Sequence, residues 1–265
     1  MRIVLAPLVG PETVVVSMQN GMNPPRIAAR ISASRVVGVF VSLPADWQGP
    51  GHIEHGGYGD VWIGELDGKA TPRREKIRSL LAHVAKAHTT DNIYGYLWSK
   101  QIDSSILYAQ AVTDGTFAEV HGDKRYQPVQ IALLGEGVGV AQAAGIKLES
   151  FRDFEPLKMR PRTEAEIAEA RAVLDRLAEV AKTQVKVRSG IWRDLAVRHR
   201  PTEVDYMLGS VVAEGKRLGV PVPLSERLLK QVKEIESGRR NRGFENLEEL
   251  EQYRKKVYGT SIGPH

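Results

Sequence analysis

The chain of 265 residues is long enough for one large domain or two smaller ones, and its 42% hydrophobic and 26% charged residues are typical of a globular protein without a membrane span. It has no cysteine, which excludes disulfides, Fe–S clusters and cysteine-based zinc sites and is typical of a reducing compartment. The formal charge of +5 divides unevenly: residues 1–149 hold 14 charges of each sign, and residues 150–265 hold 23 basic against 18 acidic residues.

Basic and acidic residues are mixed along the chain, without the aromatic-interleaved basic stripe of a nucleic-acid binder. We therefore expect attraction for small anions and no nucleic-acid or membrane partner. The N-terminal MRIVLAPLVG is broken by Pro7 and lacks the cleavage site of a signal peptide, so we expect a cytoplasmic protein.

The first 70 residues contain short β-branched runs separated by Gly, Pro and Asn, which predict strands. The run 13–19 is almost continuously apolar, as in a strand covered on both faces, and 24–34 can form the short helix that follows it. We expect the end of an α/β sheet with an added β-meander. The further predicted strands are 36–43, 52–55 and 61–66.

From Thr71 onward the apolar spacing becomes helical. Thr163 and Glu166 form a capping-box pattern at the start of one helix, and Gly219 suits the C-cap of another. The predicted helices are 71–87, 92–112, 163–187, 201–218, 224–236 and 247–257.

Two patterns resemble ligand sites but favour structural roles. The glycine-rich segment 135–145 has Val140 where the third glycine of a phosphate loop belongs, so we expect a closely packed helix there. His52 and His55 are three apart in a predicted strand, which places them on opposite faces and disfavours a shared metal. No G-x-S-x-G, H-E-x-x-H or Walker motif is present, so the sequence offers no hydrolase or NTPase chemistry and no metal site.

Three polar segments are candidates for chemistry, each with a plainer alternative. Asn20 follows the first strand, at the sheet edge where α/β proteins bind ligands, although Asn20-Gly21 also suits a simple turn. Lys100 and Ser104 share one face of a predicted helix, although such lysines are usually solvent-exposed. Glu203 falls in the first turn of the predicted helix 201–218, where an acid is commonly only a partner of the helix dipole.

Together and in this order, the motifs resemble the ketopantoate reductase (2-dehydropantoate 2-reductase) family. They are VVSMQNGMN, GHIEHGGYGDVWIG, LWSKQIDSS and WRDLAVRHRPTEVDYMLGSVV followed by GVPVP, and the likeness covers most of residues 8–240. The resemblance implies an α/β fold followed by an all-α fold. Residues 1–70 would be the C-terminal remnant of a Rossmann-type NADP-binding domain with a β-meander, 71–258 a helical substrate-binding and dimerisation domain of the 6-phosphogluconate dehydrogenase C-terminal type, and 259–265 a tail.

The resemblance also assigns roles to individual residues. Lys100 would be the general acid that protonates the ketone oxygen as hydride arrives from NADPH, and Glu203 would bind the substrate hydroxyl. Asn20 would hold both substrate and lysine and, with Gly21, lie against the cofactor. The further substrate-binding residues implied are Ser104, Ser189 and Tyr108.

This chemistry suits the residue types. Hydride addition to a ketone develops negative charge on oxygen, which a positioned ammonium can stabilise and protonate. An ionised carboxylate can accept a hydrogen bond from an alcohol, and cationic side chains can balance the carboxylate of a keto acid. Arg198 and Arg200 are candidates for that last role.

The chain departs from the family pattern at two positions and at its start. Ser104 stands where the family has Asn, and Gly190 where it has Ser, with Ser189 next to it as a substitute. These changes leave a related 2-keto acid open as the substrate. The chain also opens after the family's G-x-G-x-x-G turn, with about two βαβ units of ~30 residues missing, so we expect weak NADPH binding or none.

Two hypotheses follow. The first is an NADPH-dependent reductase of 2-dehydropantoate or a related 2-keto acid, as in pantothenate biosynthesis, that forms a homodimer through its helical domain. The second is a truncated, non-catalytic helical association module of the same family, which would fold stably and oxidise no NADPH.

Overall fold

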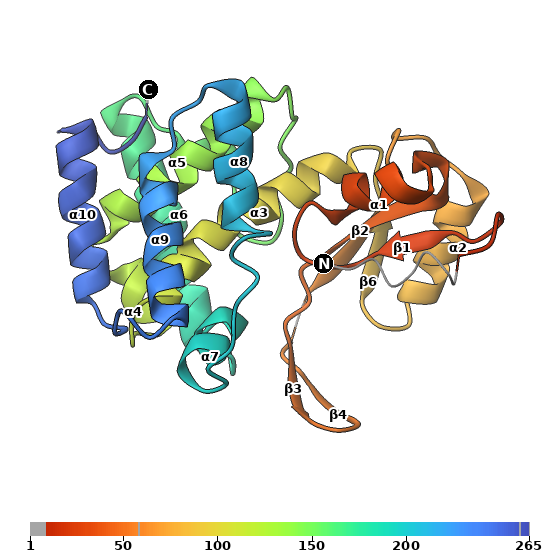
Figure 1. Cartoon of the computed structure of the whole chain (residues 1–265), viewed down its shortest axis with the longest axis horizontal. Coiled ribbons are helices and arrows are strands. Elements are labelled where there is room, and N and C mark those ends of the chain that lie inside the picture. The colour runs from red at the N-terminus through yellow and green to blue at the C-terminus, as the bar shows by residue number, and fades with distance from the viewer. Residues whose placement is uncertain (1–8, 58, 260, 265) are drawn as a thin grey trace.

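The computed structural model describes residues 9–57, 59–259 and 261–264. Figure 1 shows two parts: a sheet with its helices at one end of the molecule and a bundle of helices at the other. The prediction of an α/β part followed by an all-α part is therefore confirmed. No helix in the described ranges is both long and apolar enough to cross a membrane.

The α/β part is built on a four-stranded sheet with the order β1-β2-β5-β6. β1 is parallel to β2 and β5 is parallel to β6, whereas β2 and β5 are antiparallel. A helix lies between the strands of each parallel pair, because parallel neighbours need a crossover connection. The elements are β1 (Val15–Ser17), α1 (Asn23–Ile31), the 3-10 helix η2 (Ala33–Arg35), β2 (Val36–Val41), β5 (Asp60–Glu65), α2 (Pro72–Leu81) and β6 (Lys86–Thr89).

The first strand is less covered than its apolar sequence predicts. β2 is buried at five of its six positions and forms the centre of the sheet. β1 lies at the edge of the described sheet, and Val14 and Met18 on either side of it are 37% and 43% exposed. The expectation of a strand covered on both faces is therefore wrong for the described part of the chain.

The helix predicted over 71–87 ends early. α2 stops at Leu81, a turn follows, and Lys86–Thr89 pairs with β5 as β6. Ile77 and Leu81 pack against the sheet, but Val84 is 61% exposed, so strand pairing with β5 overrides the helical spacing. Because α2 and β6 complete the sheet, we propose to divide the two parts after Thr89, not at residue 70.

A two-stranded hairpin projects from the α/β part (Figure 1). It consists of β3 (Ala45–Gly49), which the sequence did not predict, and β4 (His52–His55), which it did. All four residues of β4 are exposed. Among the described residues no group of three or more His, Asp or Glu side chains is placed to hold a metal ion.

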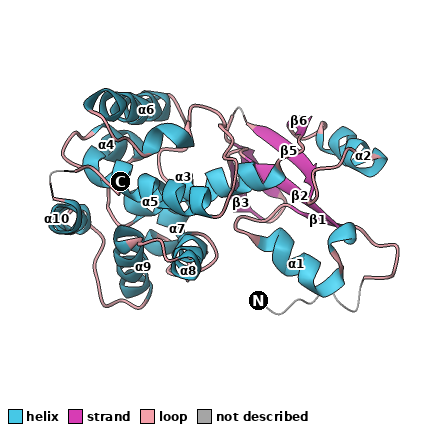
Figure 2. Cartoon of the chain, turned by 90° about the horizontal axis from the view of Figure 1, so that it is seen from above, coloured by secondary structure: helices cyan, strands magenta, loops and turns pink. Residues whose placement is uncertain are grey.

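Two long helices run through the middle of the helical part (Figure 2). They are α3 and α5, with α4 and α6 on one side and α8 and α9 on the other. α3 also extends toward the sheet and packs on β2 and β5. The elements are α3 (Ile93–Ala111), α4 (Phe117–Gly122), α5 (Gln127–Ala143), the 3-10 helix η3 (Pro156–Met159), α6 (Glu164–Lys182), α7 (Gly190–Ala196), α8 (Leu208–Leu218), α9 (Pro223–Glu236) and α10 (Glu245–Tyr258).

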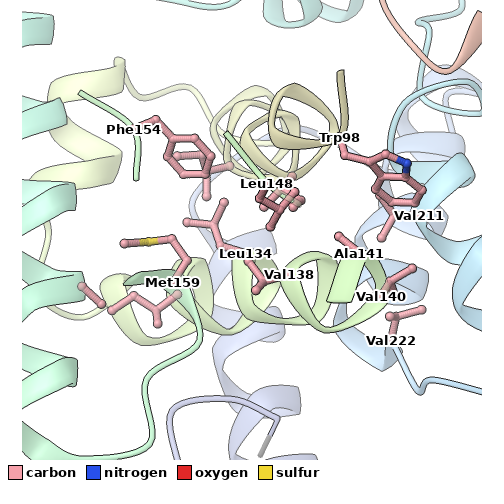
Figure 3. Packing of buried hydrophobic residues seen from close by; sticks show 14 of the residues in the cluster. Trp98, Leu134, Val138, Val140, Ala141, Leu148, Phe154, Met159, Val211 and Val222 are labelled. Atoms are coloured by element: carbon pink, nitrogen blue, oxygen red, sulfur yellow. The ribbon is translucent and has the colours of Figure 1, made fainter. Parts of the chain in front are cut away.

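The glycine-rich segment lies in α5, so the prediction of a closely packed helix is confirmed. Leu134 and Val138 of α5 lie in one buried cluster with Trp98, as Figure 3 shows. A Cβ on Gly137 would lie 3.0 Å from the Ile102 side chain. The glycine therefore lets α3 and α5 approach closely, which is a packing role and not a phosphate-binding one.

The capping signals in the sequence also hold. Thr163 and Glu166 form the predicted capping box at the start of α6, and Gly219 ends α8 with φ +69°. α6 ends at Lys182 and not at residue 187. α8 begins only at Leu208, seven residues later than predicted, which changes the setting of Glu203.

Candidate active site at the junction of the two parts

Lys100 lies on α3 where this helix meets the sheet. Its Nζ donates a hydrogen bond to the backbone oxygen of Val41, the last residue of β2. The same nitrogen lies 5.6 Å from the centroid of the Phe40 ring, within the range of a cation–π contact. The side chain is half-buried, so the expectation of a solvent-exposed lysine does not describe it. Lys100 instead directs its ammonium into the junction.

Burial lowers the pKa of Lys100 to about 8, because the charged form loses solvation. The nearby carboxylates of Asp103 and Glu203 partly oppose this decrease. Burial also raises the pKa of Asp103 to about 6, against the opposing charges of Arg152 and Lys100. An ammonium with a pKa near 8 is charged at neutral pH and still able to release its proton.

A hydrogen bond joins the two parts of the molecule at this site. Asn20 Nδ2 donates to Glu203 Oε2 at 3.0 Å, although the two residues are 183 positions apart. The turn that carries Asn20 follows β1, and Asn23 Nδ2 donates to the Asn20 carbonyl oxygen at 2.6 Å. Both Asn20 and Glu203 are exposed, so a ligand can reach them.

Gly21 allows the turn to approach the helical part. It has φ +91°, and a Cβ at this position would lie 2.8 Å from the Tyr206 carbonyl oxygen. Gln101, the neighbour of Lys100 on α3, donates from Nε2 to the same oxygen at 3.1 Å. Asn20-Gly21 is thus a turn, which was the plainer of the two interpretations. The Asn20 side chain also contacts Glu203. The turn and ligand-site interpretations are compatible.

Glu203 does not lie in the first turn of a helix, so the helix-dipole argument for it is wrong. It belongs to a turn that precedes α8, and Met207 interrupts the helical backbone with ψ −96°. The side chains of Val204 and Met207 are drawn into a core cluster, which forces this irregular path. The burial of its neighbours sets the backbone position of Glu203, and the hydrogen bond from Asn20 holds its side chain.

Ser104 and Tyr108 follow Lys100 on α3 at helical spacing, but both are fully buried. Ser104 Oγ donates to the Gln101 carbonyl oxygen of its own helix at 2.6 Å. Burial raises the pKa of Tyr108, whose hydroxyl lies near Thr202 and Glu203. In this arrangement both residues lie behind the site and do not open onto it.

Ser189 is a helix cap distant from Lys100. Its Oγ accepts the Trp192 N–H at 3.0 Å at the start of α7, and its own N–H donates to Gln110 Oε1 at 3.2 Å. Gln110 follows Lys100 by ten residues on α3, which is about 15 Å along a helix axis. The structure therefore does not bring Ser189 together with Lys100, Asn20 and Glu203.

The two arginines considered for the substrate carboxylate are paired within the chain. Arg198 Nη1 and Arg200 Nε donate to Asp194 Oδ1 at 3.0 and 2.9 Å. Sequence reasoning did not single out Arg152, which lines a cleft of about 660 Å³ between the two parts with Pro44 and His55, whereas the residues described above do not line it. That volume is typical of small-molecule sites, which span about 300–1,000 Å³. Its sequence neighbour Phe151 packs on Phe40, and the Arg152 charge acts on Asp103, on which Lys100 also acts.

The described residues do not fit the pyrophosphate of a dinucleotide. A phosphate cradle needs free backbone N–H groups at a glycine-rich turn before a helix. α1 instead opens with Pro24 and Pro25, which have no N–H, and the space above Gly21 is filled by the Tyr206 carbonyl. The cofactor contacts expected of Asn20 and Gly21 stay a prediction, and the exposed Asn20 side chain is accessible to a ligand.

Comparison with known proteins identifies the family. The model described as "Ketopantoate reductase PanE/ApbA" matches residues 3–68, and "Ketopantoate reductase PanE/ApbA C terminal" matches residues 92–236. The 2-dehydropantoate 2-reductase of Archaeoglobus fulgidus is 26% identical over 227 residues, which cover 85% of this chain and 69% of that protein. The enzyme of the same name from Vibrio cholerae is 24% identical, over 88% of this chain and 72% of its own.

Solved structures have the same fold. The PanE/ApbA family ketopantoate reductase of Ralstonia eutropha aligns with a TM-score of 0.68 and 25% identity over 88% of this chain and 70% of its own. A D-mandelate dehydrogenase in complex with NADH aligns with a TM-score of 0.73 and 21% identity over 88% and 73% of the two chains. Since the C-terminal family model alone matches more than half of the sequence, the chain belongs to the ketopantoate reductase family of oxidoreductases.

Proposed function

We propose that this chain takes part in the NADPH-dependent reduction of 2-dehydropantoate, or a related 2-keto acid, to the 2-hydroxy acid. The observation that carries the proposal is the meeting of Lys100, Asn20 and Glu203 at one junction, from three separate segments. An ammonium, an amide and a carboxylate there supply a proton donor, a neutral hydrogen-bond group and an acceptor.

Lys100 is the general acid in this proposal. Its Nζ would exchange the Val41 carbonyl for the ketone oxygen of the substrate, and it would give up a proton as negative charge develops on that oxygen. The aromatic face of Phe40 helps to hold the ammonium in its charged form before the proton is transferred. A pKa of about 8 suits both steps at neutral pH.

Glu203 and Asn20 orient the substrate. A hydroxyl on the substrate would donate to the Glu203 carboxylate, while the Asn20 amide, now on Glu203, holds that carboxylate from the other side. Because Asn20 belongs to the α/β part and Glu203 to the helical part, the substrate would lie where the two parts meet.

The proposal names NADPH as the hydride donor on the strength of family membership. The described residues do not fit its pyrophosphate, so they supply no step of hydride delivery. What they support is recognition and polarisation of the keto acid. The same observation favours a second candidate, in which the chain binds a keto acid or associates through its helices without catalysis.

NADPH oxidation in the presence of 2-dehydropantoate distinguishes the two candidates. If the chain is a reductase, it oxidises NADPH at a measurable rate, and Lys100→Ala abolishes this rate. Lys147→Ala is the control, because the Lys147 side chain is 85% exposed. A folded chain without any such rate supports the non-catalytic candidate. We also propose that the chain forms a homodimer through its helical part and is located in the cytoplasm. Light scattering of the purified chain tests the homodimer.

A further inference from the structure

The Glu203 carboxylate is carried by the short segment Thr202–Tyr206 between α7 and α8. One end of this segment is bound to the last residue of α9: the N–H and the hydroxyl of Thr202 both donate to Glu236 Oε1, each at 2.7 Å. The Glu236 side chain is only 8% exposed. Two hydrogen bonds to one shielded carboxylate oxygen fix Thr202 directly before Glu203.

Helix preference does not explain an acid at position 236. A negative charge in the last turn of a helix opposes the helix dipole. Glu236 is compensated by Lys233, whose Nζ lies 3.1 Å from Glu236 Oε2 and 2.5 Å from Asp205 Oδ2. Lys233 and Glu236 together therefore bind the segment on both sides of Glu203.

The other residues of the segment are also held by the helical part. Val204 is fully buried in the core, and the Tyr206 carbonyl oxygen accepts from Gln101 Nε2 on α3. The Glu203 side chain turns outward, toward Asn20 of the α/β part. These anchors fix the backbone on both sides of Glu203, and the Asn20 amide holds its exposed carboxylate.

We propose that Glu236 is a positioning residue: through Thr202 it fixes the place at which Glu203 meets Asn20 and the substrate. The inference rests on the proposed role of Glu203 as acceptor for the substrate hydroxyl. Glu236 itself does not touch the substrate. Loss of its carboxylate leaves the Thr202 N–H and hydroxyl without their acceptor, and the segment then moves relative to Asn20.

The test compares Glu236→Ala, Glu236→Gln and the control Glu234→Ala in the full chain. Glu236→Gln keeps an oxygen acceptor for Thr202, and Glu234→Ala removes a neighbouring acid that contacts Arg240 and Lys230 instead. The first readout is the NMR signal of the Asn20 side-chain amide, which reports the position of Glu203 without any ligand. The second is the affinity for 2-dehydropantoate by calorimetry.

We expect Glu236→Ala to shift the Asn20 amide signal and to weaken the affinity about tenfold, as the loss of a buried hydrogen-bond acceptor implies. Glu236→Gln should restore both readouts most of the way, and Glu234→Ala should change neither. An unchanged Asn20 signal in Glu236→Ala overturns the positioning role, and so does a shifted signal with unchanged affinity. If the wild-type chain bound no keto acid, the proposed function would fail, whereas the Asn20 signal would still show whether Glu236 places Glu203.

Discussion

The side chains of Asn20 and Glu203 form a 3.0 Å hydrogen bond that connects the end of β1 to the segment before α8. One residue comes from the sheet and the other from the helical bundle, so the geometry of the site depends on how the two parts meet. Removing either partner should therefore affect ligand binding more than folding.

Asn20→Asp should weaken the binding of 2-dehydropantoate more than Asn20→Ala does. The alanine variant removes one donor, whereas the aspartate places a second negative charge against Glu203. Because the pair is exposed, the alanine variant should cost at most about 1 kcal/mol of unfolding free energy. Calorimetry and urea denaturation measure the two quantities, and equal affinities for the two variants would contradict the assigned contact.

The affinity for an anionic keto acid should fall as the pH rises through about 8. Burial lowers the pKa of Lys100 to that value, so the ammonium that attracts the ligand is lost there and not near pH 10.5. For the same reason the contribution of Lys100 to stability rises with pH between about 8 and 10.5, where only the unfolded chain keeps this proton.

Lys100→Arg supplies the control for this pH dependence, because a guanidinium stays charged throughout the range. Its affinity for the keto acid should be nearly constant from pH 7 to about 10. A wild-type affinity that is equally flat would show that Lys100 does not titrate near 8, or does not contact the ligand.

Gly21→Ala should lower the free energy of unfolding by about 1–3 kcal/mol. The new Cβ would meet the Tyr206 carbonyl oxygen at 2.8 Å, and φ +91° is unfavourable for a residue with a side chain. Gly190→Ala is the matched control, since a Cβ there has no neighbour within 4 Å and the residue opens helix α7. Urea denaturation should separate the two variants, and equal stabilities would argue against the close approach at Gly21.

Glu136 should make stability depend on pH below neutrality. This buried residue of α5 accepts the backbone N–H groups of Leu224 and Ser225 at the start of α9, each at 2.8 Å, and burial raises its pKa to about 7. Between pH 4.5 and 7 the folded chain keeps a proton that the unfolded chain has lost, so stability from this group falls as pH rises.

Glu136→Gln removes the titration but keeps only one oxygen, so one of the two N–H groups, Leu224 on Oε1 or Ser225 on Oε2, loses its acceptor at every pH. Its stability should vary less with pH than that of the wild type, by up to about 1.4 kcal/mol per pH unit over this range. Parallel stability curves for the two proteins would contradict the raised pKa.

The sequence predicted those features whose causes are local. The capping box and the apolar spacing predict helix α6. Val140 stands where a phosphate loop needs its third glycine, and this predicts the helix α5 in place of a loop. The strand β6 was missed because its residues continue a helical pattern, and only the neighbouring strand β5 makes them extended. The residues of the site were found through motif order, since no local pattern distinguishes Lys100 from a surface lysine.

The support of the site could not be predicted in the same way. Gln101 bonds a carbonyl 105 residues later, and Glu236 bonds a residue 34 positions earlier. Both contacts depend on tertiary packing, and neither residue type stands out on its helix. The misplacement of Glu203 in a helix has the same origin, because burial of Val204 and Met207 decides the path of that segment.

Calorimetric titration of 2-dehydropantoate into the wild-type chain, Lys100→Ala and Lys147→Ala tests the central claim most directly. We predict that the wild type and Lys147→Ala bind with equal affinity and that Lys100→Ala binds at least about tenfold more weakly, a difference of about 1.4 kcal/mol. Equal affinity of Lys100→Ala and the wild type, or no binding by any of the three, would contradict a keto-acid site at this junction.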